Sequence, residues 1–278
     1  MANHLPRPKQ LAILQALTEG CSVRSTERMV GVSRETVLSL LVRVGRGCAV
    51  LLDKMMRNLT CERLELDEIW SYVHTKQRHL HDASDATHGD RWVFVAIDAD
   101  TKLIPCFRVG DRDAATTRAF VEDLAGRLTN RVQISADGFG PYVNAIEDAF
   151  GADVDFGTVL KEYEAEPLGP GRYSPPHVTK VTKTVVTGDP NVALISTSYV
   201  ERQNLTIRMR TRRFTRLTNA FSKKLENHGA AVALHMAAYN LVTVHQTLRV
   251  TPAMAANVTQ NVWSMEELLD RALEARTA

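Results

Sequence analysis

Apolar side chains recur at helical spacing over residues 7–18, 22–30 and 33–44. Pro6 and Pro8 open the first pattern, and Ser33 is a favoured N-cap residue for the third. The tripeptide 31–33 is a tight turn between the second and third patterns, an arrangement typical of a helix-turn-helix. The sequence therefore predicts an all-α helix-turn-helix domain over residues 1–60. A plain three-helix bundle without a role in DNA binding is the alternative.

The periodicity changes to that of strands from residue 64. Residues 64–73 alternate apolar and polar side chains, residues 91–98 are nearly all apolar, and residues 103–109 follow after a turn. These three segments predict an antiparallel meander. Residues 116–128 form an amphipathic helix pattern, and residues 131–135 predict a fourth strand.

The second half of the chain is read mostly as helix. A short helix is predicted at residues 143–150, and a basic helix at 199–224 is followed by a long helix at about 227–244. Residues 157–198 are rich in Gly, Pro, Ser and Thr, which favours a mobile loop, with a possible hairpin around 178–187. A further helix is expected at about 265–275.

Three antiparallel strands, a helix, another strand and then helices is the order of a ribonuclease H-like domain, although no physical rule makes the order unique. We expect an α/β fold in which helices flank a mixed sheet over residues 61–250. The N-terminal helix-turn-helix domain would precede it, and a C-terminal helical tail at 251–278 would follow it.

Composition adds few constraints. The 278 residues are 44% hydrophobic and 24% charged, which are ordinary values for a globular protein, and the net charge is +2. The four cysteines are widely spaced without a Cys-x-x-Cys pair, and the chain opens without a signal peptide. These features favour reduced, structural thiols in a cytoplasmic protein. No apolar run approaches the length of about 18 residues that a membrane span needs.

The positive charge is concentrated in one segment, residues 201–224. This segment contains one acidic residue, Glu201, and eight basic residues: Arg202, Arg208, Arg210, Arg212, Arg213, Arg216, Lys223 and Lys224. Such a cationic helix is expected to lie along a polyanion, and its single carboxylate suggests a metal ion held beside that polyanion.

Two upstream acids are the expected partners of Glu201. Asp67 lies inside the first strand, where a charged side chain needs a partner, a metal ion or a cleft, and Asp137 directly follows the fourth strand. Since the first and fourth strands of a ribonuclease H-like sheet are neighbours, Asp67 and Asp137 should meet. Glu65 and Glu68 are alternatives to Asp67.

Structural roles are the other interpretation of two of these acids. Asp137 precedes Gly138, as a turn residue would. Ser198 lies three residues before Glu201, the spacing of a capping box.

Three carboxylates without a histidine or cysteine cluster suit Mg²⁺ or Mn²⁺, which prefer oxygen ligands. Two such ions about 4 Å apart activate a water or a 3′-hydroxyl and stabilise the leaving oxygen in phosphoryl transfer. The sequence therefore predicts Asp67, Asp137 and Glu201 as metal ligands and catalytic residues.

Candidate DNA contacts fall in two places. Arg34 and Thr36, at the start of the third predicted helix, would face the major groove, with Arg43 near the DNA backbone. In the basic segment the candidates are Arg208, Arg210, Arg212, Arg213 and Arg216. Arg208 follows Glu201 by two helical turns, so the two side chains should share a face.

Three motifs resemble the DDE transposases of the insertion sequence 1 family. They are Leu-Asp67-Glu-Ile-Trp-Ser-Tyr, Ser-Ala-Asp137-Gly-Phe-Gly-Pro-Tyr and Tyr-Val-Glu201-Arg-Gln-Asn-Leu-Thr-Ile-Arg-Met-Arg. The resemblance covers roughly residues 62–256, and the Glu201 motif is its most specific part. Members of that family carry a Cys-rich zinc-binding segment before the helix-turn-helix, which this sequence lacks.

The resemblance implies a ribonuclease H-like catalytic domain with Asp67, Asp137 and Glu201 as metal ligands. It also implies DNA strand cleavage and strand transfer at the terminal repeats of a mobile element. A homo-oligomer on DNA is expected for this reaction class. A nuclease that only cleaves is one alternative, and a helix-turn-helix regulator with an inactive ribonuclease H-like domain is the other.

Overall fold

The computed structural model describes residues 5–81, 85–164, 177–216 and 218–277. The strands are β1 (Arg63–Val73), β2 (Gly89–Asp98), β3 (Cys106–Gly110), β4 (Val132–Asp137), β5 (Val154–Glu164) and β6 (His177–Thr187). The α-helices are α1 (Arg7–Thr18), α2 (Val23–Val30), α3 (Arg34–Met55), α4 (Ala114–Ala125), α5 (Pro141–Phe150), α6 (Ser198–Arg210), α7 (Leu225–Ala237), α8 (Pro252–Ala255) and α9 (Met265–Thr277).

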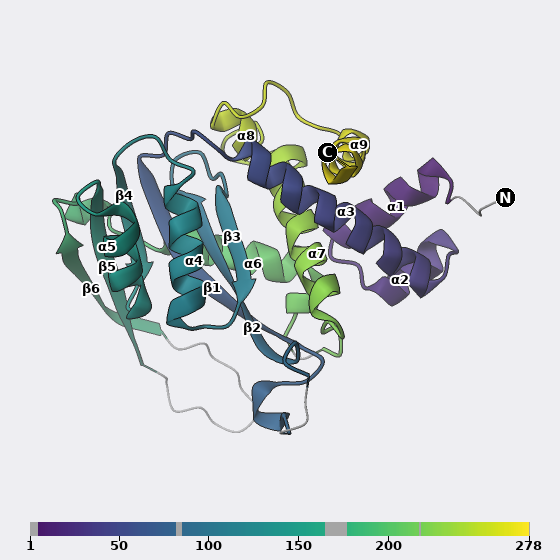
Figure 1. Cartoon of the computed structure of the whole chain (residues 1–278), viewed down its shortest axis with the longest axis horizontal. Helices are drawn as coiled ribbons and strands as arrows, with labels where there is room; N and C mark the ends of the chain where they lie inside the picture. The colour runs from purple at the N-terminus through teal and green to yellow at the C-terminus, as the bar shows by residue number, and fades with distance from the viewer. Residues whose placement is uncertain (1–4, 82–84, 165–176, 217, 278) are drawn as a thin grey trace.

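The strands form one mixed sheet in the order β3-β2-β1-β4-β5-β6. β1, β2 and β3 are an antiparallel meander, β4 and β5 run parallel to β1, and β6 is antiparallel to β5. The helices α4 and α5 make the crossovers and lie together over one face of the sheet (Figure 1). This is the ribonuclease H-like fold, as the order of predicted elements indicated.

The opposite face of the sheet is covered by α6 and α7. Strand alternation turns Glu65, Asp67 and Ser71 toward this face, where they contact α6 and α7 through hydrogen bonds. Buried Val200 and Ile207 of α6 recur at seven-residue spacing, so one stripe of this polar helix packs on the sheet.

The N-terminal helices begin close to where the sequence predicts, and α1 and α2 also end there. The Ser22 and Ser33 hydroxyls accept hydrogen bonds from the backbone N–H groups of Ser25 and Thr36, and Gly31 ends α2 at φ +65°. α3 continues to Met55, eleven residues beyond the predicted end at Val44. Its C-terminal half extends because it packs against α7 and α9, with Gly45 and Gly47 at the close contacts.

The helices of the N- and C-terminal segments and the sheet contribute to one cluster of buried side chains. The division into domains at residues 60 and 250 stays a prediction. Among the described residues no disulfide forms, and Cys48, Cys61 and Cys106 are buried. Burial raises the pKa of the Cys48 thiol to about 12, which keeps it protonated and unreactive.

The predicted helix over 199–224 is wrong in its length, because α6 ends at Arg210. Thr211 adopts an extended conformation, and the chain turns inward so that Phe214 is buried with its ring 5.2 Å from that of His228. A single straight helix would carry Phe214 away from this core.

The predicted mobile loop over 157–198 is wrong for the described residues, which include most of β5, all of β6 and the first residue of α6. The possible hairpin around 178–187 is confirmed, because β6 spans His177–Thr187 and pairs antiparallel with β5. The inner half of β5 is buried, whereas its outer half and β6 are largely exposed. Their order comes from backbone pairing, which leaves no apolar periodicity in the sequence. Residues 165–176 lie outside the described ranges.

Candidate active site and nucleic-acid interface

The site lies where two parallel strands separate. β1 and β4 are paired up to Leu66 and Ala136, and the next residue of each strand is an aspartate, Asp67 and Asp137. A crevice forms at the carboxyl ends of parallel strands where their neighbours diverge. The prediction that the first and fourth strands are neighbours is therefore confirmed, and it brings these two acids together.

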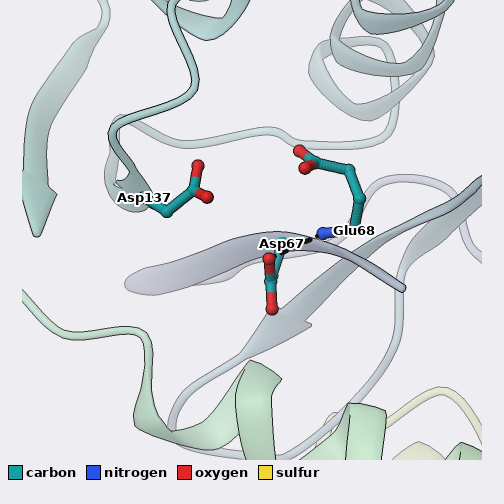
Figure 2. A group of neighbouring side chains, drawn as sticks. All are labelled: Asp67, Glu68 and Asp137. Carbon is teal, nitrogen blue, oxygen red and sulfur yellow. Dashed lines mark hydrogen bonds between the residues drawn. The ribbon is translucent and has the colours of Figure 1, made fainter. Parts of the chain in front are cut away.

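Three carboxylates, Asp67, Glu68 and Asp137, form what we call the acidic trio. One oxygen of each lies within 4.8 Å of the others. Figure 2 shows Asp67 and Glu68 adjacent in β1, with Asp137 facing them from the end of β4. Adjacent strand residues such as Asp67 and Glu68 point to opposite faces of the sheet. Both can therefore approach Asp137 only at the edge where β1 and β4 part.

Backbone and side-chain donors hold the two aspartates. Asp67 Oδ1 accepts a hydrogen bond from the Glu68 N–H at 2.8 Å, and Asp67 Oδ2 accepts one from Asn204 Nδ2 at 2.8 Å. Asp137 Oδ1 accepts a hydrogen bond from the Phe139 N–H at 2.9 Å. Each carboxylate keeps acceptor capacity, because an ionised carboxylate has about four lone-pair positions.

Burial raises the pKa of Asp67 to about 7, and the nearby charges of Glu68, Asp137 and Glu201 act in the same direction. Desolvation disfavours the charged form, and repulsion between like charges adds to that cost. The arrangement is thus electrostatically unfavourable without a compensating cation.

Glu68 is the trio member that is tied to a fixed cation. Arg112 Nε donates to Glu68 Oε2 at 3.0 Å, and Arg112 lies 3.8 Å from Asp137 Oδ2. The other oxygen, Glu68 Oε1, is buried without a hydrogen bond of good geometry, and the buried Tyr142 hydroxyl beside Glu68 lowers the Glu68 pKa as a donor. Desolvation first, and then the Asp137 charge, raise the pKa of Glu68.

Glu65, the other alternative to Asp67, has a structural role. Its Oε2 accepts hydrogen bonds from the backbone N–H groups of Tyr199 and Val200 at 2.7 and 3.0 Å. These groups are the unpaired donors of the first turn of α6, so Glu65 caps that helix from β1. It thereby fixes where α6 begins and where Glu201 is presented.

Glu201 lines the same cleft as the trio. The cleft has a volume of about 460 Å³, and besides Glu68 its polar lining includes Asp67, Asp137, Lys161, Glu201, Asn204 and Arg208. Glu201 Oε1 pairs with Lys161 Nζ and accepts a hydrogen bond from the Thr197 hydroxyl at 2.7 Å. The capping-box interpretation of Glu201 is wrong, since Thr197 is the N-cap residue and makes no side-chain cap.

The arginines predicted to bind DNA differ in their surroundings. Arg208 lines the cleft two turns after Glu201, and burial lowers its pKa from the ordinary value. Arg210 pairs with Glu19 at 3.4 Å, whereas Arg212 and Arg216 are exposed. Arg213 donates to the Ser222 hydroxyl at 2.8 Å, and burial lowers its pKa to about 10, so it faces inward.

The three residues of α3 that were predicted to contact DNA differ in position and exposure. Arg34 is exposed and lies 3.5 Å from Glu27, while the Thr36 hydroxyl lies 3.0 Å from that of Ser33. Both occupy the first turn of α3. Arg43 is partly buried, and its Nε has no hydrogen-bond partner. Their role in DNA binding stays a prediction.

The donor set of the cleft fits a hard divalent cation. The trio offers only oxygen atoms, which Mg²⁺ and Mn²⁺ prefer, and one of them, Glu68 Oε1, is buried and unpartnered. Octahedral Mg²⁺ binds oxygens at about 2.1 Å, so opposite ligands are about 4.2 Å apart. The trio oxygens, which lie within 4.8 Å of one another, are near that spacing, and Glu201 lines the same cleft.

Four residues of the site were not singled out as functional by the sequence. Asn204 lies three residues after Glu201 on the same helix, and this spacing was an available signal. Lys161 was assigned to a loop, and Arg112 fell between a predicted strand and a predicted helix, so neither carried a signal. Glu68 appeared only as an alternative to Asp67, but it belongs to the trio together with Asp67.

Comparison with known proteins yields solved structures only. No family model and no curated protein matches the chain. The matched structures include a Mos1 transposase paired-end complex with the left transposon end, at 16% identity and a TM-score of 0.23, and the Mos1 strand transfer complex, at 18% and 0.22. A third is the Mos1 mariner paired-end complex with Mn, at 14% and 0.20.

The matched region covers 53–54% of this chain and 57–59% of the Mos1 chains. The chain therefore spans little more than half the length of these structures, and such low scores carry no argument about its activity.

No helix in the described ranges combines the length and the apolar character that crossing a bilayer requires.

Proposed function

We propose that this protein is a DNA transposase that cleaves and joins DNA strands by metal-dependent phosphoryl transfer. The observation that carries the proposal is the gathering of Asp67, Asp137, Glu201 and Arg208 in one cleft of a ribonuclease H-like fold. The motifs around these residues support a finer assignment, to the insertion sequence 1 family of DDE transposases. On that assignment the substrates are the terminal repeats of the element and a target DNA.

Asp67 and Asp137 would hold Mg²⁺ or Mn²⁺, with Glu201 as the third ligand. When bound, the ion supplies Lewis-acid activation of the attacking oxygen and charge stabilisation at the scissile phosphate. Asn204 orients the Asp67 carboxylate through its hydrogen bond, and Glu65 sets the position of α6. Arg208 would bind a phosphate of the DNA strand beside the ion.

The ion pair between Glu68 and Arg112 reduces the negative charge of the acidic trio. The Arg112 guanidinium pairs closely with Glu68, at 3.0 Å, and more distantly with Asp137, at 3.8 Å, which leaves Asp67 and Asp137 with capacity for a further cation. Ring contacts hold Arg112 in place, since it lies 3.8 Å from the Phe139 ring centroid and 5.1 Å from that of Trp92.

The test uses DNA carrying the element's own terminal repeats, with Mg²⁺ or Mn²⁺, and resolves the products on a denaturing gel. We expect the wild type to nick the repeat end and to join a pre-cut end to target DNA. Changing groups that only support metal ligands costs about 10- to 100-fold, so Asp137→Asn should lose at least about a hundredfold in both products.

Asp148→Asn is the matched control, because Asp148 is an exposed acid of α5 that pairs with Arg118 outside the cleft. Equal activity of Asp137→Asn and wild type would contradict the proposal. Cleavage without any joined product would reduce the function to that of a nuclease.

The pairing of Glu201 with Lys161 favours a second candidate, a helix-turn-helix regulator whose ribonuclease H-like domain is inactive. In that case Lys161 would permanently neutralise the third ligand. This candidate predicts specific binding to the repeats that Mg²⁺ leaves unchanged, and no nicked product with either ion.

A further inference from the structure

The β1–β2 hairpin extends past the rest of the sheet, close to the acidic trio. β3 pairs with β2 only from Trp92 onward, so the segment in which Trp70 lies opposite Trp92 begins a two-stranded ribbon. In Figure 1 this ribbon projects beyond α4 toward the lower edge of the molecule. Strand alternation places Glu68, Trp70 and Tyr72 on one face of β1.

Trp70 and Tyr72 of this ribbon, together with Phe221 of the segment before α7, form what we call the aromatic row. The ring centroids of Trp70 and Tyr72 are 5.7 Å apart, and those of Tyr72 and Phe221 are 5.0 Å apart at an interplanar angle of 28°. All three side chains are only half-buried. The row therefore presents ring surface to solvent instead of closing a core.

The position of Phe221 is fixed by its neighbour. Ser222 bridges Val73 at the end of β1, and the His74 N–H donates to the Ser222 carbonyl at 2.7 Å. The Ser222 hydroxyl also accepts a hydrogen bond from Arg213. This anchoring holds the Phe221 ring against Tyr72, so the row is preformed.

Positive charge surrounds the row. Lys76 Nζ lies 5.7 Å from the Trp70 ring centroid and 5.8 Å from that of Tyr72. Lys223 and Lys224 follow Phe221 after Ser222 and are exposed. Arg112, just after β3, packs on Trp92, the cross-strand neighbour of Trp70, and pairs with Glu68 of the trio. Arg112 thus links the surface that carries the row to the trio, and the lysines make that surface complementary to a polyanion.

We propose that the aromatic row stacks the unpaired bases of a DNA strand whose scissile phosphate lies at the acidic trio. The inference rests on the proposed function and deepens it by naming the form of the substrate near the cut. Base–aromatic stacking tolerates any sequence, because every base has a π-face, and flanking lysines follow the phosphates. A duplex held only through its backbone uses cations and has no use for three partly exposed rings.

The dimensions agree with a short stretch of strand. Glu68 and Tyr72 are four strand residues apart, which is about 13 Å. At about 3.4 Å per nucleotide, this distance accommodates about four nucleotides between the cleft and the far end of the row.

The experiment measures binding by fluorescence anisotropy, in EDTA so that no cleavage occurs. Three probes share one duplex: a blunt form, a form with a short single-stranded thymine extension, and a form whose extension carries the same phosphates but abasic sites. We expect the wild type to bind the thymine extension about tenfold more tightly than the abasic one. Tyr72→Ala and Phe221→Ala should bring this ratio close to one, and Tyr72→Phe should preserve it.

Tyr199→Ala is the matched control, because Tyr199 is also a partly exposed tyrosine with a lysine, Lys102, over its ring, but it lies on α6. Its ratio should equal that of the wild type. Thermal unfolding of each variant checks that the fold is retained.

A wild-type ratio of one, or a Tyr72→Ala ratio unchanged from wild type, would overturn the stacking proposal. If the blunt duplex still binds in either case, the proposed DNA function survives that failure. Absence of binding to all three probes would overturn both.

Discussion

Two regions of the molecule surround their buried polar side chains with different partners. In the helical layer where α7 covers the sheet, His228 lies between the hydroxyls of Ser71 and Ser222, at 3.1 Å from each. Asn240, just after α7, hydrogen-bonds both the N–H and the carbonyl of Ile104. In the cleft, three carboxylates crowd together, and Glu68 Oε1 and Asn204 Oδ1 have no partner.

The difference separates residues that stabilise the fold from residues kept for another purpose. A buried polar group with all its partners contributes to a unique packing, whereas an unpartnered one lowers stability by about 1–3 kcal/mol. Like charges and unpartnered oxygens persist at sites that bind something absent from the bare protein. The cleft combines unpartnered oxygens with crowded like charges, whereas the helical layer, although His235 Nε2 is also unpartnered, has no such crowding among its described residues.

The largest expected effect is in the helical layer, at Gly47 of α3. A Cβ at this position would lie 2.6 Å from the carbonyl carbon of Ala272 in α9, a backbone atom that cannot move aside cheaply. We expect Gly47→Ala to lower the free energy of unfolding by about 3 kcal/mol, as overpacking does. Urea unfolding followed by circular dichroism measures the change.

Gly229→Ala is the matched control, because Gly229 lies in α7, where an added methyl group would have no neighbouring atom within 4 Å. It should stabilise the protein by about 0.5–1 kcal/mol through helix propensity. If both variants behave alike, close packing of α3 is not what holds this layer together.

A smaller loss of folding stability is expected at acidic pH, because the histidines of α7 are buried. Burial lowers the pKa of His235 from 6.5 to about 4. In the unfolded chain His235 is protonated below about pH 6.5, whereas in the folded protein it stays neutral down to about pH 4. Its contribution to folding stability is therefore fully present above pH 6.5 and is lost as the pH falls. Between pH 7 and pH 5 this one group should cost about 2 kcal/mol.

The comparison of wild type with His235→Phe isolates that contribution. The variant keeps a ring beside Tyr239, which lies 6.5 Å from the imidazole centroid, but has nothing to protonate. Urea unfolding at pH 7 and pH 5 should show a fall smaller by about 2 kcal/mol in the variant. Equal falls in both proteins would mean that His235 is not buried in its neutral form.

The smallest effect is in the cleft and has the opposite sign. Asp137→Asn removes one charge from the trio, so without divalent ions it should stabilise the fold by about 1 kcal/mol while abolishing activity. Mg²⁺ or Mn²⁺ should raise the melting temperature of the wild type and leave that of Asp137→Asn nearly unchanged, because a ligand stabilises only the state that binds it. Thermal unfolding with and without each ion measures both effects.

A melting temperature of Asp137→Asn below that of wild type in EDTA would show that the trio is not under electrostatic strain. The exposed acid Asp148, changed to Asn, should alter neither the stability nor the response to metal by more than about 0.5 kcal/mol.

Local features of the sequence determined the elements with strong periodicity. The three N-terminal helices, two of them with serine N-caps, the β1–β2–β3 meander and the strand that ends at Asp137 follow from apolar spacing and turn chemistry over a few residues. These features depend on interactions within about ten residues, so they can be predicted directly from the sequence. The proximity of Asp67 and Asp137 is long-range and followed only once the strand order was assumed.

Only the tertiary structure decided the rest. β6 and the outer half of β5 are largely exposed, so backbone pairing with a neighbour orders them and no periodicity marks them. The basic helix ends at Arg210 because burying Phe214 against His228 outweighs helical continuation, and α3 continues through two glycines because α7 and α9 pack there.

The roles of the glutamates near Asp67 depend on partners far along the chain: Glu65 caps α6, and Glu68 binds Arg112. No local pattern encodes such long-range contacts, because the free energy that selects them exists only once the layers are packed.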